Sequence, residues 1–152
     1  MIVYADASAL VKRYVTEPGS KETIAMTTEA EAVATAIVSR AEVAAAFARA
    51  VRVRVLDEEG CRRAQRRFSR EWPDLVRVAV TEALVERAET LAWEYQLRGY
   101  DAIQLAAALT WRDALGQEVV LATFDHQLWE TAPQAGLEAW PKQLSGDSAH
   151  AH

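Results

Sequence analysis

Four acidic residues stand where a predicted element of the chain ends or the next one begins: Asp6, Glu42, Asp101 and Asp125. Asp6 and Asp125 each follow an apolar run, whereas Glu42 and Asp101 lie at the start of predicted helices. In a parallel sheet the carboxyl ends of the strands, and the helix starts that follow them, share one edge, so we expect these carboxylates to lie near one another. Oxygen-only ligands suit Mg²⁺ or Mn²⁺, and a protein-bound Mg²⁺ is usually completed by water and substrate phosphate. The acids therefore predict a divalent-metal site that acts on a phosphate group.

A second explanation is that each acid caps a helix. Residues 39–42 match the spacing of a capping box, and Asp101 with Gln104 fits a similar arrangement. Asp6 and Asp125 could each be a simple N-cap. Capping needs only Ser, Thr or Asn, however, and four carboxylates packed together without a cation would repel one another. The four together favour the metal site.

Zinc is a poor alternative to a hard cation. The chain has one cysteine, Cys61, and its three histidines, at positions 126, 150 and 152, lack the spacing of zinc ligands. A single cysteine also excludes an internal disulfide and favours a reducing, cytoplasmic setting. No apolar run approaches the roughly 18 residues that a membrane span needs, so no membrane association is predicted.

The elements that must hold the acids alternate between strands and helices. Apolar β-branched runs predict strands, at residues 2–5, 32–37, 75–80 and 118–122, with a further edge strand at 137–140. Stretches of helical periodicity separate them, which predicts an α/β, three-layer fold: a mainly parallel sheet of four to five strands with helices on both faces. One domain is expected over residues 1–144, and residues 145–152, small and polar, are expected to be disordered.

Several helix boundaries can be predicted from single residues. Ser20 is a predicted N-cap, as are Asp57 and Thr81, and Gly99 is predicted to stop the helix before it. Residues 133–136 are predicted to form a turn.

Two helices have distinctive patterns. One begins at residue 39 and carries an apolar stripe, Val43, Phe47, Val51 and Val55; the alternation over 51–55 also fits a strand, but the unbroken four-residue spacing favours a helix. Its many alanines suggest that this helix is buried. The helix over 102–115 is apolar on nearly every side through residue 109 and is predicted to be sandwiched.

The charge of the chain is uneven. The net charge is −5, yet residues 40–77 hold ten arginines and six acids, so the rest of the chain carries −9. Arg63, Arg66, Arg67 and Arg70 are spaced to lie on one helix face, and Arg49, Arg52 and Arg54 on the preceding helix add to the basic region. Such a face is either simply solvated or a contact for nucleic acid.

Four short segments carry a resemblance to a known family: residues 3–10 (VYADASAL), 39–42 (SRAE), 100–108 (YDAIQLAAA) and 122–125 (ATFD). In this order and spacing they closely resemble the PIN-domain nucleases, in particular the VapC-type toxins of prokaryotic toxin–antitoxin pairs. The resemblance spans residues 1 to about 141. Gln104 stands where many relatives have His, a departure that we do not expect to affect metal binding.

The resemblance implies an endoribonuclease that depends on Mg²⁺ or Mn²⁺. By position, the catalytic and metal-binding acids would be Asp6, Glu42, Asp101 and Asp125, with Ser8 and Thr123 as supporting hydroxyls. The RNA substrate would be contacted by the arginines of the basic region: Arg49, Arg52, Arg63, Arg66, Arg67 and Arg70. The family also implies a homodimer and a cognate antitoxin that covers the active site.

Other protein classes fit less well. A dehalogenase-type phosphatase needs a second Asp where this chain has Ser8, and a dinucleotide-binding domain needs a glycine-rich turn after a strand. A receiver domain would need paired acids at the first strand and a late lysine; Lys142, the only late one, follows a proline. The alternative from another class is a non-cleaving RNA-binding or protein-interaction module on the same fold. The presence of all four acids argues against it.

Overall fold

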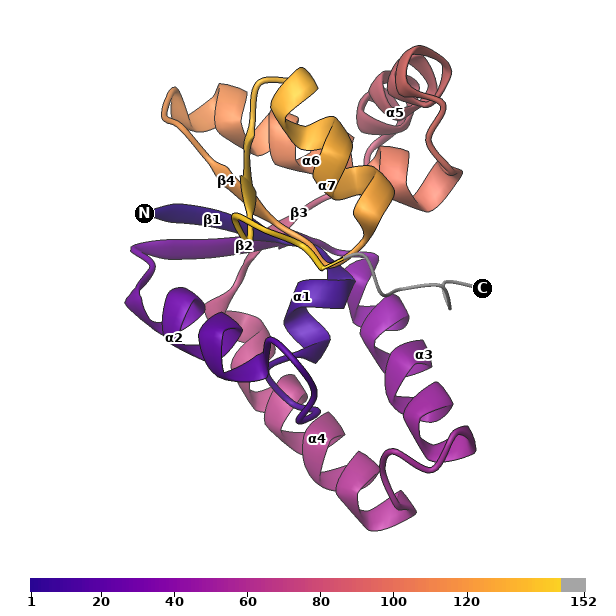
Figure 1. Ribbon diagram of the computed structural model, residues 1–152. Helices are drawn as coiled ribbons and strands as arrows, with labels where there is room; N and C mark the ends of the chain where they lie inside the picture. The colour runs from indigo at the N-terminus through magenta and orange to yellow at the C-terminus, as the bar shows by residue number, and fades with distance from the viewer. Residues whose placement is uncertain (146–152) are drawn as a thin grey trace.

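The computed structural model describes residues 1–145 and contains a five-stranded sheet in the order β3-β2-β1-β4-β5 (Figure 1). All four strand pairings are parallel, which confirms the predicted α/β architecture. The predicted edge strand is present and pairs with β4. The strands are short: β1 (Ile2–Ala5), β2 (Ala32–Ala36), β3 (Val76–Val78), β4 (Val120–Ala122) and β5 (Glu138–Trp140).

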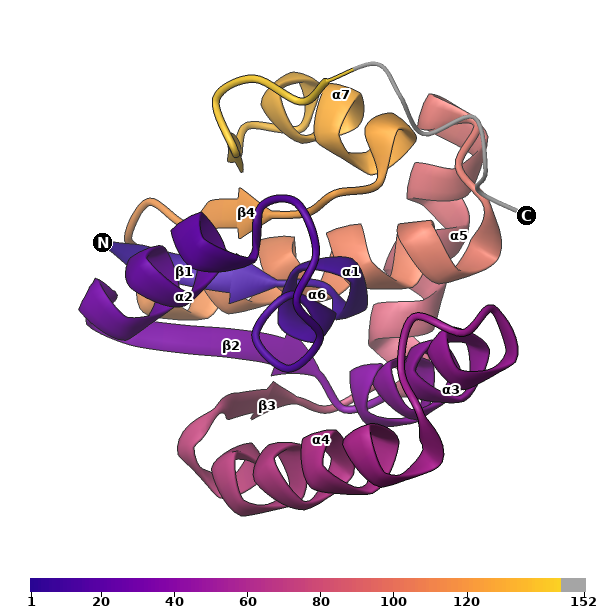
Figure 2. The same cartoon turned by 60° about the horizontal axis from the view of Figure 1, so that its bottom comes forward.

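Helices cover both faces of the sheet. Along the chain they are α1 (Ala7–Val11), α2 (Ser20–Glu29), α3 (Ser39–Arg52), α4 (Glu58–Glu71), α5 (Glu82–Tyr95), α6 (Gly99–Leu115) and α7 (His126–Gln134), with a 3₁₀ turn at Trp72–Asp74. The first four lie on one side of the sheet and the last three on the other (Figures 1 and 2).

Alternation along β1 divides the core in two. Tyr4 points into a cluster formed with α5, α6 and α7, whereas Val3 and Ala5 point into a second cluster with Phe47 and Phe68. Helix α6 is buried on most sides, as predicted, because it lies between the sheet and α5. The sheet is therefore packed against a hydrophobic core on each of its two faces.

Two helix boundaries differ from the predictions. Ser20 is the first residue of α2, and Gly19 is its N-cap with φ of 92°; the Ser20 hydroxyl instead donates to the Val15 carbonyl at 2.9 Å. Helix α5 ends at Tyr95, where Gln96 adopts a left-handed conformation with φ of 55°, and Gly99 opens α6. A polar residue in the left-handed region can end a helix as glycine does, which sequence periodicity does not reveal.

Helix α3 is shorter and more exposed than predicted. It ends at Arg52, so residues 51–55 form neither one helix nor a strand. Val53 and Val55 are 57% and 55% exposed, and the apolar stripe therefore continues only as far as Val51. The Val43 and Phe47 side chains are buried in the core, on the side of α3 that packs against α1 and α4. The predicted burial of this helix is wrong, since its alanines at 41, 44, 45 and 48 are exposed.

The remaining predictions concern two helix caps, a turn and the C-terminal residues. Asp57 and Thr81 are the N-caps of α4 and α5, as predicted. The turn predicted at 133–136 is wrong in its first half, because α7 continues through Gln134 with Pro133 in its last turn. The disorder predicted for 145–152 falls outside the described residues, apart from Ser145.

Candidate active site

Asp6 is held rigidly at the end of β1. It is 5% exposed and caps α1, since its Oδ1 accepts from the Ala9 amide at 3.0 Å and from the Ser8 hydroxyl at 2.6 Å. Its Oδ2 accepts from the Thr123 hydroxyl at 2.5 Å. These bonds use both carboxylate oxygens, so the Asp6 side chain has one defined orientation.

Ser8 and Thr123 join the end of β1 to the end of β4. The Ser8 hydroxyl accepts from the Phe124 amide at 2.8 Å, and the Thr123 hydroxyl accepts from the Asp125 amide at 3.0 Å. Both side chains also bond to Asp6, and their oxygens are 3.4 Å apart. The hydroxyl pair therefore sets the position of Asp6 relative to Asp125.

The capping interpretation is right for two acids and wrong for the other two. Asp125 caps α7 through a bond from the Leu128 amide to its Oδ1 at 2.9 Å, and Asp6 caps α1. Glu42 forms no capping box, because the N-cap of α3 is Val38 and lacks a side-chain bond. Asp101 is no cap either, because α6 begins after Arg98, whose side chain makes no capping bond. Half-buried acids that cap nothing call for another explanation.

Glu42 bonds to a different helix. Its Oε1 accepts from the amide of Gln104, in α6, at 2.9 Å. Arg98 lies beside two other acids: its Nε is 3.7 Å from Asp101 Oδ2 and its Nη2 is 3.8 Å from Asp125 Oδ2. One exposed guanidinium thus faces two carboxylates from different helix starts.

The acids perturb one another electrostatically. Burial raises the pKa of Asp6 to about 6, against the hydrogen bonds of Ser8, Thr123 and Ala9, and the charge of Asp125 adds to the rise. Burial also raises the pKa of Asp101 to about 6, with contributions from Asp125 and Asp6 that Arg98 partly offsets. The four acids form one electrostatic cluster.

Glu42 belongs to the same cluster. Burial raises its pKa, the hydrogen bond from Gln104 opposes the rise, and the charge of Asp101 adds to it.

The residue types of this cluster fit a hard divalent cation. Every candidate ligand is a carboxylate, which suits Mg²⁺ or Mn²⁺, and a bound cation would offset both the burial and the repulsion that raise the pKa values of Asp6, Glu42 and Asp101. Within residues 1–145, no three Asp, Glu, His or Cys side chains form a ready-made metal-binding group. The case for a divalent cation at this cluster therefore rests on the type of ligand atoms and on their negative charge.

The predicted arginines divide into two groups. A hollow on α4 is lined by Arg62, Arg63, Arg66, Arg67 and Arg70. Arg63 pairs with Glu59 at 3.4 Å, and Arg67 stacks over Tyr14. Arg66 and Arg70 form no ion pair within the described part of the chain.

Arg49 belongs to another part of the surface. It lines a cavity of about 300 Å³ with Ser8, Lys12 and Phe124, next to Asp6. Arg52 is exposed in the last turn of α3 and lines neither hollow. The arginines predicted to contact RNA thus line two different hollows, or neither of them.

Three residues near the cluster were not predicted as site residues: Gln104, Tyr4 and Arg98. Gln104 is 2% exposed. It could have been noticed in the sequence because it is the one polar residue in the apolar stretch 102–109. Arg98 stands three residues before Asp101, a spacing that would have suggested an ion pair. Tyr4 was harder to recognise, because the only indication in the sequence is a side-chain hydroxyl within a run predicted to be a buried strand.

Comparison with known proteins identifies the family. The model of the PIN domain family matches residues 3–133 of the chain. The chain belongs to the PIN domain family.

Relatives of this PIN domain cover almost its whole length. Ribonuclease VapC45 and ribonuclease VapC49, from two strains of Mycobacterium tuberculosis, are each 36% identical to it over 144 residues, which is 94% of this chain and 97% of theirs. A toxin–antitoxin complex from Klebsiella pneumoniae contains a chain with the same fold, at a TM-score of 0.56 and 18% identity, covering 79% of this chain and 84% of that one. No helix within residues 1–145 of this PIN domain has the length and apolar character to cross a membrane.

Proposed function

We propose that this PIN domain is a metal-dependent endoribonuclease and the toxin of a toxin–antitoxin pair. The observation that carries the proposal is the cluster of four carboxylates at the carboxyl edge of the sheet, where burial, with a smaller contribution from neighbouring acids, raises the pKa values of Asp6, Glu42 and Asp101. The identity to two VapC ribonucleases supports the reaction, and the fold shared with a toxin–antitoxin complex supports the biological setting.

In this proposal Asp6, Glu42, Asp101 and Asp125 hold Mg²⁺ or Mn²⁺. A bound divalent ion would supply a water of lowered pKa and positive charge for the phosphodiester transition state. Asp6 contributes a fixed carboxylate, because Ser8 and Thr123 leave it one orientation. Asp101 and Asp125 are more exposed and lie where a phosphodiester can approach. Arg98, beside them, can bind a phosphate oxygen.

The remaining parts of the proposal follow from the family resemblance. They are a cognate antitoxin that covers the acids, a homodimer, and a cytoplasmic location, which the single free cysteine supports. Sedimentation of the purified protein with and without the protein encoded beside it would test the first two.

Metal dependence can be tested directly. The purified protein should cleave single-stranded or loop-containing RNA in Mg²⁺ or Mn²⁺ and should lose this activity in EDTA, because the acid cluster alone repels the phosphate backbone. Restoring Mn²⁺ after EDTA is the control for irreversible damage. Cleavage that continues in EDTA would refute the metal mechanism, and specific RNA binding without cleavage in any metal would favour the binding module instead.

We also propose that α4 contacts the RNA backbone through Arg66 and Arg70. In an Asp6→Asn background, which binds without cutting, Arg66→Ala with Arg70→Ala should weaken RNA binding about tenfold at low salt. The slope of log affinity against log salt should fall by about 1.4, because each single-strand phosphate contact contributes roughly 0.7. Fluorescence anisotropy over a salt series measures both quantities.

A matched control for α4 is Arg87→Ala. Arg87 lies on the other side of the sheet and pairs with Asp113 at 2.9 Å, so its loss should leave the salt slope unchanged. Equal slopes for the α4 variant and the unsubstituted background would show that the α4 arginines are only solvated.

A further inference from the structure

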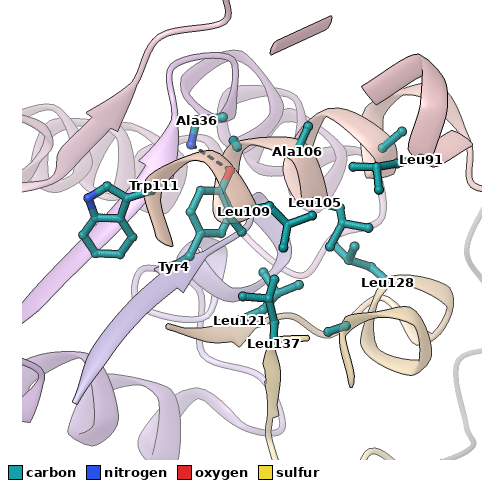
Figure 3. Close-up of a cluster of buried hydrophobic side chains, with 14 of the residues drawn as sticks. Tyr4, Ala36, Leu91, Leu105, Ala106, Leu109, Trp111, Leu121, Leu128 and Leu137 are labelled. Atoms are coloured by element: carbon teal, nitrogen blue, oxygen red, sulfur yellow. Dashed lines mark hydrogen bonds between the residues drawn. The ribbon is translucent and has the colours of Figure 1, made fainter. Parts of the chain in front are cut away.

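A buried chain of hydrogen bonds connects the backbone of β2 to the side chain of Gln104. The Ala36 amide donates to the Tyr4 hydroxyl oxygen at 3.0 Å, and Figure 3 shows this bond within the apolar cluster around Leu105 and Leu109. The Tyr4 hydroxyl donates in turn to Gln104 Oε1 at 2.5 Å. A tyrosine hydroxyl is protonated at neutral pH, so it can donate this bond while it accepts from Ala36.

This chain determines which way the Gln104 amide points. Because Tyr4 donates to Oε1, the NH₂ group faces the other way, and its two hydrogens go to Ser39 Oγ at 3.0 Å and Glu42 Oε1 at 2.9 Å. Ser39 Oγ is itself bonded to the Thr35 hydroxyl at 2.7 Å. A flipped amide would lose the bond from Tyr4 and place its oxygen against the Glu42 carboxylate, so both neighbours favour the observed orientation.

Packing alone does not account for glutamine at this position. The buried residues on either side of it in α6 are alanine and leucine, and an apolar residue at 104 would fill the same space without a polar group to satisfy. A free glutamate side chain also has several rotamers, and fixing one of them when the cation binds costs conformational entropy. Gln104 fixes Glu42 in advance.

We propose that Gln104 is the positioning residue for Glu42. Its amide holds Oε1 and leaves Oε2 available to a cation, and Tyr4 keeps the amide in the required orientation. The inference rests on the proposed function, in which Glu42 is a metal ligand. The expectation that glutamine in place of histidine at 104 leaves metal binding unaffected stays a prediction, because this inference concerns what the glutamine itself does.

The test measures Mn²⁺ binding to RNA-free protein by electron paramagnetic resonance at pH 7.5. Gln104→Met keeps the length of the side chain and removes its donors, and should raise the Kd for Mn²⁺ about 10- to 100-fold, the usual effect of losing a partner of a metal ligand. Tyr4→Phe frees the amide to rotate and should raise the Kd by a smaller factor, about 3- to 10-fold.

Thr131→Val is the matched control. The Thr131 hydroxyl is also buried and bonds to the Gln127 carbonyl at 2.7 Å within α7, away from Glu42. This variant should lose some stability and keep the Kd of the unsubstituted protein. It separates general loosening of the core from a specific effect on Glu42.

Other results would contradict either the role of Gln104 or the metal site itself. If Gln104→Met and Tyr4→Phe, both folded by circular dichroism, bind Mn²⁺ within twofold of the unsubstituted protein, Gln104 does not position Glu42. If Gln104→Met does not fold, Tyr4→Phe alone decides. If the unsubstituted protein binds no Mn²⁺, or if Glu42→Gln leaves the Kd unchanged, the proposed metal site itself is wrong, and the inference falls with it.

Discussion

Replacing Asp6 by asparagine should lower the rate of RNA cleavage at least about a thousandfold, which corresponds to about 4 kcal/mol of lost transition-state stabilisation. The fold should persist, because the amide oxygen can still accept from Ala9 and Ser8, while the Thr123 hydroxyl can turn to accept from the new NH₂ group. The variant loses a charge at the centre of the acid cluster and little else. Single-turnover cleavage rates, with thermal unfolding to check the fold, measure the effect.

Asp57→Asn is a close control for this substitution. Asp57 is also an N-cap, with its Oδ1 accepting from the Gly60 amide at 2.6 Å, but it is exposed at the start of α4. The same chemical change there should leave cleavage unchanged. In a host cell, growth arrest by the unsubstituted protein and by Asp57→Asn, but not by Asp6→Asn, would agree with a toxin. An Asp6→Asn variant that cleaves within tenfold of the unsubstituted protein would contradict the proposed role of Asp6.

Replacing Asp101 by asparagine should make the metal-free protein more stable at pH 7.5. The folded protein raises the pKa of Asp101 from 3.8 to about 6, so it binds the proton more tightly than the unfolded chain does. The contribution of Asp101 to the free energy of unfolding is therefore fully present below about pH 4 and is lost as the pH rises through about 6. A shift of two units is worth at most about 3 kcal/mol, and partial exposure of the side chain reduces this to about 1–2 kcal/mol.

Urea unfolding in EDTA at pH 4 and pH 7.5 measures this effect. Asparagine does not ionise, so the gain in stability should be present at pH 7.5 and absent at pH 4. Mn²⁺ should then stabilise the unsubstituted protein more than the variant. A variant that is less stable at pH 7.5 in EDTA would mean that the charged Asp101 carboxylate does not destabilise the metal-free fold.

Asp113→Asn gives a control of opposite sign. A hydrogen bond from Arg87, with a further one from Arg112, holds the pKa of Asp113 below its usual value. Its charge therefore contributes stability above the unfolded pKa that is lost as the pH falls. Removing this charge should slightly lower stability at pH 7.5, whereas removing the charge of Asp101 should raise it.

The architecture could be predicted because it depends on local patterns. Strand runs and helix stripes are repeated signals, and an alternating order of strands and helices leaves few topologies other than a parallel sheet. Helix ends were less predictable. A single residue such as Gln96 can adopt the left-handed conformation that ends α5, and the extent of α3 depends on which neighbours cover it.

The same contrast holds at the acid cluster. Asp6 and Asp125 are the caps that the sequence suggests, because an N-cap bond joins residues three positions apart. Glu42 also fits a capping box in the sequence, yet its partner, Gln104, lies 62 positions away. A contact between distant positions depends on how two helices pack, and no local pattern encodes it.

By itself, the sequence determined that four acids follow the strands or open the helices of a parallel sheet, and hence that they share its carboxyl edge. The physical reason is that strand direction and helix start are local properties, and a parallel sheet aligns them. Only the tertiary structure decided which residues each acid contacts. Asp6 accepts from the Ser8 and Thr123 hydroxyls, and Arg98 lies beside Asp101 and Asp125. Glu42 accepts from the Gln104 amide, which Tyr4 orients from within the core. Those partners come from the packing of β1, β4 and α6, which brings together residues as far apart as Tyr4 and Gln104.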